Sequence, residues 1–226
     1  MNVELLQYPE NPERAVATAA RLCYAPVGAK ELMETMPEER VKSVLSTIMS
    51  SGHFSTLEHV SYTFAVDGVS RALTHQLVRH RLASFNQQSQ RYVKFTDDLN
   101  VVKPETVAQN EETNRVFDEA VDAVVDAYHK LLEAGVPAED ARYLLPNAAE
   151  TKIVITMNIR ELLHFFSLRC CNRAQWEIRE LANKMLELVR PTAPFIFMDA
   201  GAPCVRGACP EGKMTCGRPY PRVTRG

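Results

Sequence analysis

The stretch from Arg79 to Tyr92 holds the residue types best suited to binding an anion. It contains three arginines, one histidine, two serines and several amides, but no acid. The acid-free zone extends from Gly68 to Thr96, although Asp and Glu make up 28 of the 226 residues. Guanidinium groups without neighbouring carboxylates are suited to an external anion, most naturally a phosphate. The segment therefore predicts a site for a phosphate-bearing ligand.

A solvated helix face is the alternative interpretation of these arginines. Arg79 and Arg81 are two positions apart, so on a helix they would point in different directions. The run of Ser, Asn and Gln that follows has few residues that favour a helix or a core. A cationic helix end followed by a polar, amide-rich loop fits a ligand site better than a surface stripe.

The elements of the first half of the chain must position this loop. Asn11 and Pro12 are typical of a helix start, Gly52 of a helix end and Ser70 of a helix cap. Alternating apolar residues indicate a strand after Val60, which Asp67-Gly68 would end. The expected elements are a strand at 3–8, a helix from 12 towards 24, a helix after Met36, a strand at 60–66, a helix from Ser70 to about His80 and a strand at 92–95.

The second half is mostly helical in pattern. Asn158 and Glu161 have the spacing of a capping box at a helix start. The expected elements are one long helix within 104–134, a short helix from Pro137 through Arg142, a strand at 152–157, a helix from 158 to about 170 and a helix from 174 to 191. The predicted class is α+β, with a small sheet packed with several helices. Residues 1–200 are expected to form a single catalytic domain, and residues 201–226 a Cys/Gly/Pro-rich extension, loosely ordered or draped on a partner subunit.

Bulk composition restricts the function classes. The chain is 46% hydrophobic and 24% charged, with a net charge of −2, as in ordinary globular proteins. That charge argues against a general nucleic-acid binder and favours a local site for a small anion. No signal peptide or membrane-spanning run is evident, so we expect a cytoplasmic protein with reduced cysteines and no membrane partner.

The order Arg-His-Arg-x-x-Ser-x-Asn-x-x-Ser-x-Arg-Tyr, from Arg79 to Tyr92, resembles the signature of the flavin-dependent thymidylate synthases. All eight fixed positions are filled. The resemblance covers roughly residues 1 to 200 and extends to other segments: Gly52-His53, Glu58-His59, Asn158-Ile159-Arg160, Leu168-Arg169 and Ala174-Gln175-Trp176-Glu177.

The resemblance implies an activity and an assembly. The family converts dUMP to dTMP by reductive methylation. Methylenetetrahydrofolate is the carbon donor, NADPH-reduced FAD is the hydride carrier, and no enzymic cysteine acts as nucleophile. The family fold is a homotetramer whose active sites lie at subunit interfaces.

The resemblance also assigns roles to individual residues. Arg169 is the implied catalytic residue, binding the uracil ring and favouring its electron-rich, deprotonated form. Arg142 would meet the nucleotide from a neighbouring subunit, and Gln87 stands where relatives often have Glu. The implied FAD contacts are His53, Ser55, Arg79, His80, Arg81, Gln87, Asn158, Ile159, Arg160 and His164. The implied dUMP contacts are Gln76, Arg79, Gln87, Gln88, Ser89, Gln90, Arg91, Arg142 and Arg169.

Two other functions stay open at this point. A non-catalytic RNA-binding module could use the basic strip at 79–94. A thiol enzyme could act through Cys170 or Cys171, because Arg169 beside them can lower a thiol pKa. Asn158 could equally be only a helix cap, and Arg169 could form a structural salt bridge to Glu161 or Glu177.

A metal site is not expected. His53 and His59 lack further ligands, and the spacing of Cys204, Cys209 and Cys216 is irregular for zinc.

Overall fold

The computed structural model describes residues 1–95 and 99–223, and it has the predicted α+β class. Its small antiparallel sheet has the strand order β1-β2-β4-β3. The strands are β1 (Asn2–Gln7), β2 (Ser61–Ser70), β3 (Ala83–Gln87) and β4 (Glu150–Asn158). The chain divides into two compact units: unit 1 holds residues 1–2, 66–79 and 86–153, and unit 2 holds residues 3–65, 80–85 and 154 onward.

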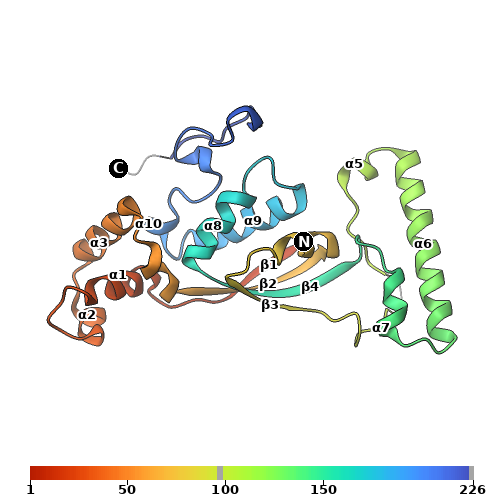
Figure 1. Ribbon diagram of the computed structural model, residues 1–226, viewed down its shortest axis with the longest axis horizontal. Helices are drawn as coiled ribbons and strands as arrows, with labels where there is room; N and C mark the ends of the chain where they lie inside the picture. Colours follow the sequence, from red (N-terminus) through yellow and green to blue (C-terminus); the bar gives the residue numbers. More distant parts are fainter. Residues whose placement is uncertain (96–98, 224–226) are drawn as a thin grey trace. The chain divides into compact units, whose positions relative to one another are not determined.

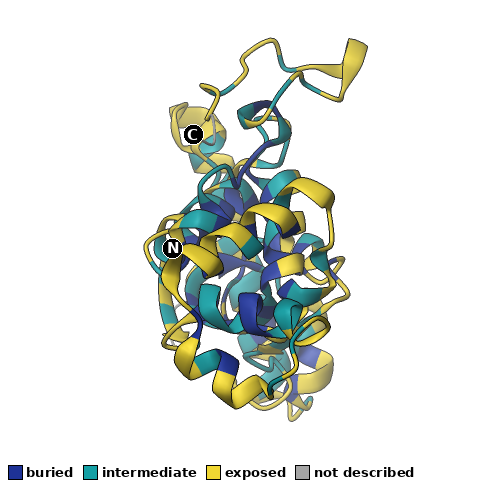
Figure 2. Ribbon diagram, turned by 90° about the vertical axis from the view of Figure 1, so that its left-hand side faces the viewer, coloured by how far each residue is buried: buried dark blue, intermediate teal, exposed yellow. Residues whose placement is uncertain are grey.

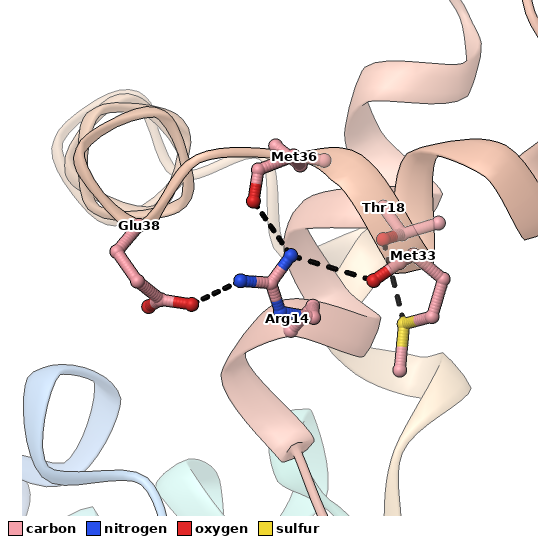
Figure 3. A network of polar contacts seen from close by, with 5 residues as sticks. All are labelled: Arg14, Thr18, Met33, Met36 and Glu38. Carbon is pink, nitrogen blue, oxygen red and sulfur yellow. Dashed lines mark hydrogen bonds and ion pairs between the residues drawn. The ribbon is translucent and has the colours of Figure 1, made fainter.

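Unit 2 begins with β1 and three short helices that pack together, α1 (Pro12–Leu22), α2 (Ala29–Thr35) and α3 (Glu38–Ser51) (Figure 1). Their ribbons alternate between buried and exposed residues, as amphipathic helices do (Figure 2). Arg14 of α1 binds the junction between α2 and α3 (Figure 3). Its Nη1 donates to the Met36 carbonyl at 2.6 Å, and its guanidinium pairs with Glu38. Gly52, with φ 73°, ends α3 in the left-handed conformation that glycine allows.

The rest of unit 2 encloses an aromatic core. A 3-10 helix, η1 (Phe54–His59), leads into β2, and α8 (Ile159–Arg169), α9 (Trp176–Val189) and α10 (Pro194–Phe197) follow β4. Tyr62 is fully buried, and its hydroxyl lies 2.8 Å from the Thr192 hydroxyl. The other large aromatic side chains of this core are Phe64, Phe165, Phe166 and Phe197.

The described part of the C-terminal extension contacts its own chain. Asn172 Nδ2 donates to the Arg218 carbonyl at 3.0 Å, and the Tyr220 hydroxyl donates to Asn172 Oδ1 at 2.8 Å. Two single 3-10 turns, η3 (Pro203–Val205) and η4 (Gly212–Met214), are its only regular elements among the described residues. These contacts join the described part of the extension to the segment after α8.

Unit 1 contains the last residues of β2, the first residues of β4 and several helices. Its helical elements are α4 (Arg71–Leu77), α5 (Glu105–Ala108), α6 (Glu111–Glu133), α7 (Ala138–Ala141) and the 3-10 turn η2 (Arg142–Leu144). Ser70 Oγ accepts from the Leu73 amide at 3.0 Å, which confirms the predicted cap of α4. On α6 only Tyr128 is buried, so most of its apolar stripe is partly accessible within this chain.

One predicted boundary and two predicted elements differ from the structure. β2 continues through Gly68 to Ser70, because Gly68 adopts φ 71° within the strand; an added Cβ there would meet the Met1 backbone nitrogen at 3.2 Å. The expected long helix within 104–134 is confirmed as α6, which starts where the Asn110 side chain accepts from two amides; the short helix α5 before it was not predicted. The predicted strand at 92–95 is irregular chain, and residues 83–87, expected to lie in a polar loop, form β3 instead. The helices α2 and η1 were not predicted.

Among residues 1–95 and 99–223, no helix combines the length and the apolar character that crossing a bilayer requires.

Candidate active site

A largely buried polar cluster of unit 2 joins Arg169, His80 and Glu161. Arg169 Nε donates to His80 Nε2 at 3.1 Å, and His80 Nδ1 lies 2.9 Å from Glu161 Oε1. His80 and Glu161 are each 4% exposed. Glu161 and Arg169 come from the two ends of α8, and His80 from the segment after α4. Three positions far apart in sequence thus form one connected network.

Burial dominates the electrostatics of this cluster. Desolvation lowers the pKa of His80 below 6.5; the nearby Arg169 acts in the same direction, and the Glu161 hydrogen bond opposes it. Burial also lowers the pKa of Arg169, although a guanidinium remains charged at any physiological pH. Arg169 and Glu161 are connected through the His80 ring, which hydrogen-bonds to both of them.

Three other flavin candidates of unit 2, His53, Ser55 and Arg160, lie on or beside η1 and α8, two elements that contact each other. Arg160 Nη1 lies 2.5 Å from Glu58 Oε1, and both side chains are about half exposed. His53 and Ser55 are exposed at the start of η1. Arg81 is also exposed. These side chains give unit 2 an accessible set of cations and hydrogen-bond donors.

Two flavin candidates at the start of α8 have structural roles. Asn158 Oδ1 accepts from the Glu161 amide at 2.9 Å, so its predicted cap is confirmed. Ile159 is fully buried, and its amide donates to the Val60 carbonyl at 2.9 Å. His164 is exposed on α8, with its ring centroid 5.9 Å from that of His80.

The nucleotide candidates of unit 1 gather around α7. Arg91 pairs with Glu139 Oε2 at 2.8 Å from both Nε and Nη2. Arg142 Nε donates to the carbonyl of the same Glu139 at 3.1 Å. Burial lowers the pKa of Arg71, and the positive charge of the nearby Arg142 lowers it further. Three arginines and one carboxylate in one region could bind a phosphate.

The signature residues beside these arginines are anchored by hydrogen bonds. Gln87 Nε2 donates to Thr74 Oγ1 at 3.2 Å and to Thr151 Oγ1 at 3.3 Å. Ser89 Oγ accepts from the Arg91 amide at 3.2 Å. Gln87, Gln88, Ser89 and Gln90 are all partly accessible, and so are Gln76 and Arg79 on or just after α4.

Sequence reasoning missed the acidic partners of the site. Glu58, Glu139 and Glu161 each pair with a predicted ligand-binding residue. Glu58 was visible as part of the resemblance, and Glu161 as part of a capping box and as a possible partner of Arg169, but their pairings with Arg160 and His80 were not predicted. Arg71 was visible as part of the acid-free zone but had no assigned role.

The cysteines of the thiol alternative lie near Arg169 in sequence but differ in environment. Burial raises the pKa of the Cys170 thiol to about 12, so it is protonated at neutral pH. Cys171 is partly accessible and lines a cavity of about 410 Å³ together with Arg169 and residues of the extension. Cys204, Cys209 and Cys216 line the same cavity. Within the described part of the chain, no three His, Cys, Asp or Glu side chains are placed to hold a metal ion together.

Comparison with known proteins settles the family. The family model described as thymidylate synthase complementing protein matches residues 4–195. The chain belongs to this family. A flavin-dependent thymidylate synthase of Geobacter sulfurreducens is 59% identical over 96% of this chain and 94% of its own length. Proteins of the same name from Clostridium tetani and Pyrococcus abyssi are 50% and 42% identical, over 96% and 95% of this chain and 94% and 91% of their own lengths.

The family match includes the signature segment at 79–92. It also includes both clusters described above and ends before the extension that begins at residue 201. The cysteines of the extension are therefore outside the part of the chain that defines the family.

Proposed function

We propose that this protein is a flavin-dependent thymidylate synthase. It methylates dUMP to dTMP with methylenetetrahydrofolate as carbon donor and NADPH-reduced FAD as hydride carrier. The observation that carries the proposal is the 59% identity, over 96% of the chain, to a relative of that name. The buried network that holds Arg169 and the accessible arginines of both units support it.

The donor chemistry of the chain fits FAD. Arg79, Arg81 and Arg160 are accessible guanidiniums, and an anionic diphosphate is the kind of group they bind well. His53 and Ser55 would add neutral hydrogen bonds from η1. FAD supplies the redox chemistry of the reaction, and the protein supplies orientation and charge. The remaining proposed FAD contacts are His80, Gln87, Asn158, Ile159 and His164; His80 and Ile159 are buried, and the Ile159 amide already donates to the Val60 carbonyl.

The dUMP phosphate is assigned to Arg91, Arg142 and Ser89, with Gln76, Arg79, Gln87, Gln88 and Gln90 around them. We propose a homotetramer in which Arg142 reaches the nucleotide of a neighbouring subunit. Residues 1–200 form the catalytic domain in this proposal, and the extension from 201 is an addition to it. A shared site would explain why one chain of 226 residues carries anion-binding groups at scattered positions.

Arg169 is the proposed catalytic residue. Its permanent charge, partly withdrawn from water, stabilises negative charge that develops on the uracil ring. The high pKa of Cys170 supports a reaction without an enzymic thiolate nucleophile.

The test is direct. The purified protein should be yellow, bleach with NADPH, release FAD on denaturation and form dTMP from dUMP and methylenetetrahydrofolate. Arg169→Ala should lower kcat by about 100- to 1000-fold, the usual effect of removing one stabilising donor. A colourless protein that forms no dTMP would overturn the function. Full kcat in Arg169→Ala would overturn the catalytic assignment alone.

A further inference from the structure

The hydrogen bonds of His80 fix the position of its proton. An arginine Nε–H can only donate, so His80 Nε2, 3.1 Å away, must accept and carries no proton. The ring proton of a neutral imidazole then lies on Nδ1, which donates to Glu161 Oε1 at 2.9 Å. The network is a carboxylate, a neutral imidazole and a guanidinium, each oriented by the next.

We propose that His80, held by Glu161, is a positioning residue that fixes the plane of the Arg169 guanidinium for the reaction. The inference rests on the proposed function, because that function assigns the catalytic role to Arg169. A side chain with four rotatable bonds is poorly defined by backbone position alone. The buried His80 ring, 4% exposed and packed edge-on against Phe165 at 4.9 Å, offers a rigid acceptor.

The proton state is essential to this role. If His80 were protonated, its Nε2 could no longer accept from Arg169, and a second cation would lie beside the guanidinium. The ionisable groups that act on His80 are Glu161, Arg169 and His164, all on α8. Burial, Arg169 and His164 favour the neutral ring, whereas Glu161 favours the charged one, and the balance lies on the neutral side. Glu161 thus orients the ring without making it a cation.

The first arm of the test reads the tautomer and needs no turnover. Nitrogen-15 NMR of histidine-labelled, full-length protein at pH 7.5 separates a neutral ring with its proton on Nδ1 from one with its proton on Nε2. His80→Gln identifies the His80 signals by their loss. We expect the Nδ1–H form, and an Nε2–H form or an imidazolium would overturn the proposal.

The second arm compares variants. Gln at position 80 can still accept from Arg169 and never titrates, whereas Leu has similar volume and no acceptor. We expect His80→Leu to lower kcat about 10- to 100-fold, on the order of one hydrogen bond to a charged group, with a smaller change in the KM for dUMP. His80→Gln should recover most of that loss. His75→Leu removes an exposed imidazole from α4 as the matched control.

Each outcome decides one question. Equal kcat in His80→Leu and the wild type would overturn the positioning role. An equal loss in the Leu and Gln variants, with FAD retained and unfolding unchanged, would also overturn it. Failure of the wild type to form dTMP would overturn the proposed function. The NMR experiment would still show which ring nitrogen of His80 carries the proton.

Discussion

Glu139 offers a sharp test of the proposed phosphate site, because it occupies a guanidinium that the phosphate needs. Arg91 pairs with Glu139 Oε2 at 2.8 Å, and the two side chains are 50% and 48% exposed. An exposed ion pair of this kind contributes about 0 to 1 kcal/mol. A hydrogen bond from a guanidinium to phosphate contributes more, about 1.5 to 3 kcal/mol. Phosphate should therefore displace Glu139 at a small cost.

The two partners should then have effects of opposite sign. Glu139→Gln removes the competing carboxylate and should lower the KM for dUMP by up to about 5-fold, the equivalent of 1 kcal/mol. Arg91→Ala removes the phosphate contact and also the ion pair that the phosphate would displace. The net loss is about 0.5 to 3 kcal/mol, which should raise the KM for dUMP about 2- to 160-fold. Both variants should keep kcat, because neither group touches the base in this proposal.

The assay is dTMP formation at varied dUMP, repeated at low and high salt, with dUMP affinity measured by calorimetry. Glu111→Gln is the matched control, since Glu111 is also an acid in the first turn of a helix. Arg142 should be little affected by Glu139→Gln, because it bonds the backbone carbonyl of that residue. If Glu139→Gln raised the KM as Arg91→Ala does, Glu139 would support the site rather than compete for it.

Three further predictions concern stability and reactivity. Tyr62→Phe should lower the free energy of unfolding by about 0.5 to 1.5 kcal/mol in chemical denaturation, because it removes the 2.8 Å contact with Thr192; no loss would show that this bond is energetically neutral. Iodoacetamide at pH 7.5 should label exposed Cys23 well before Cys170, whose pKa is raised to about 12, and dTMP formation should survive the first labelling; rapid inactivation with Cys170 modified would favour a thiol enzyme. The folded-state pKa of His80 is lowered from 6.5, so the unfolded chain binds more protons and stability should fall as pH drops below about 6.5. His80→Gln should flatten that dependence, measured by urea unfolding at pH 5 and 7.5.

The amino-acid sequence alone determined the family, the α+β class and most helix and strand positions. These features depend on local patterns: a fixed-spacing signature at 79–92, caps such as Ser70 and Asn158, and the alternation of β2. Each acts through neighbouring backbone groups, so short-range chemistry specifies it. The errors arose where pairing overrode local preference, as in β3, whose polar residues join the sheet by pairing with β4, a strand far away in the sequence.

Only the tertiary structure decided how the charged residues are partnered. His80, Glu161 and Arg169 are separated by up to 89 positions, and nothing in their local sequence indicates that they share a proton network. The same holds for Arg91 with Glu139. Buried charged groups require partners, but which partner is near depends on how the strands and helices pack. The arginine-rich segment thus predicts anion binding, and the fold determines which guanidinium is held rigid and which is free to exchange its partner.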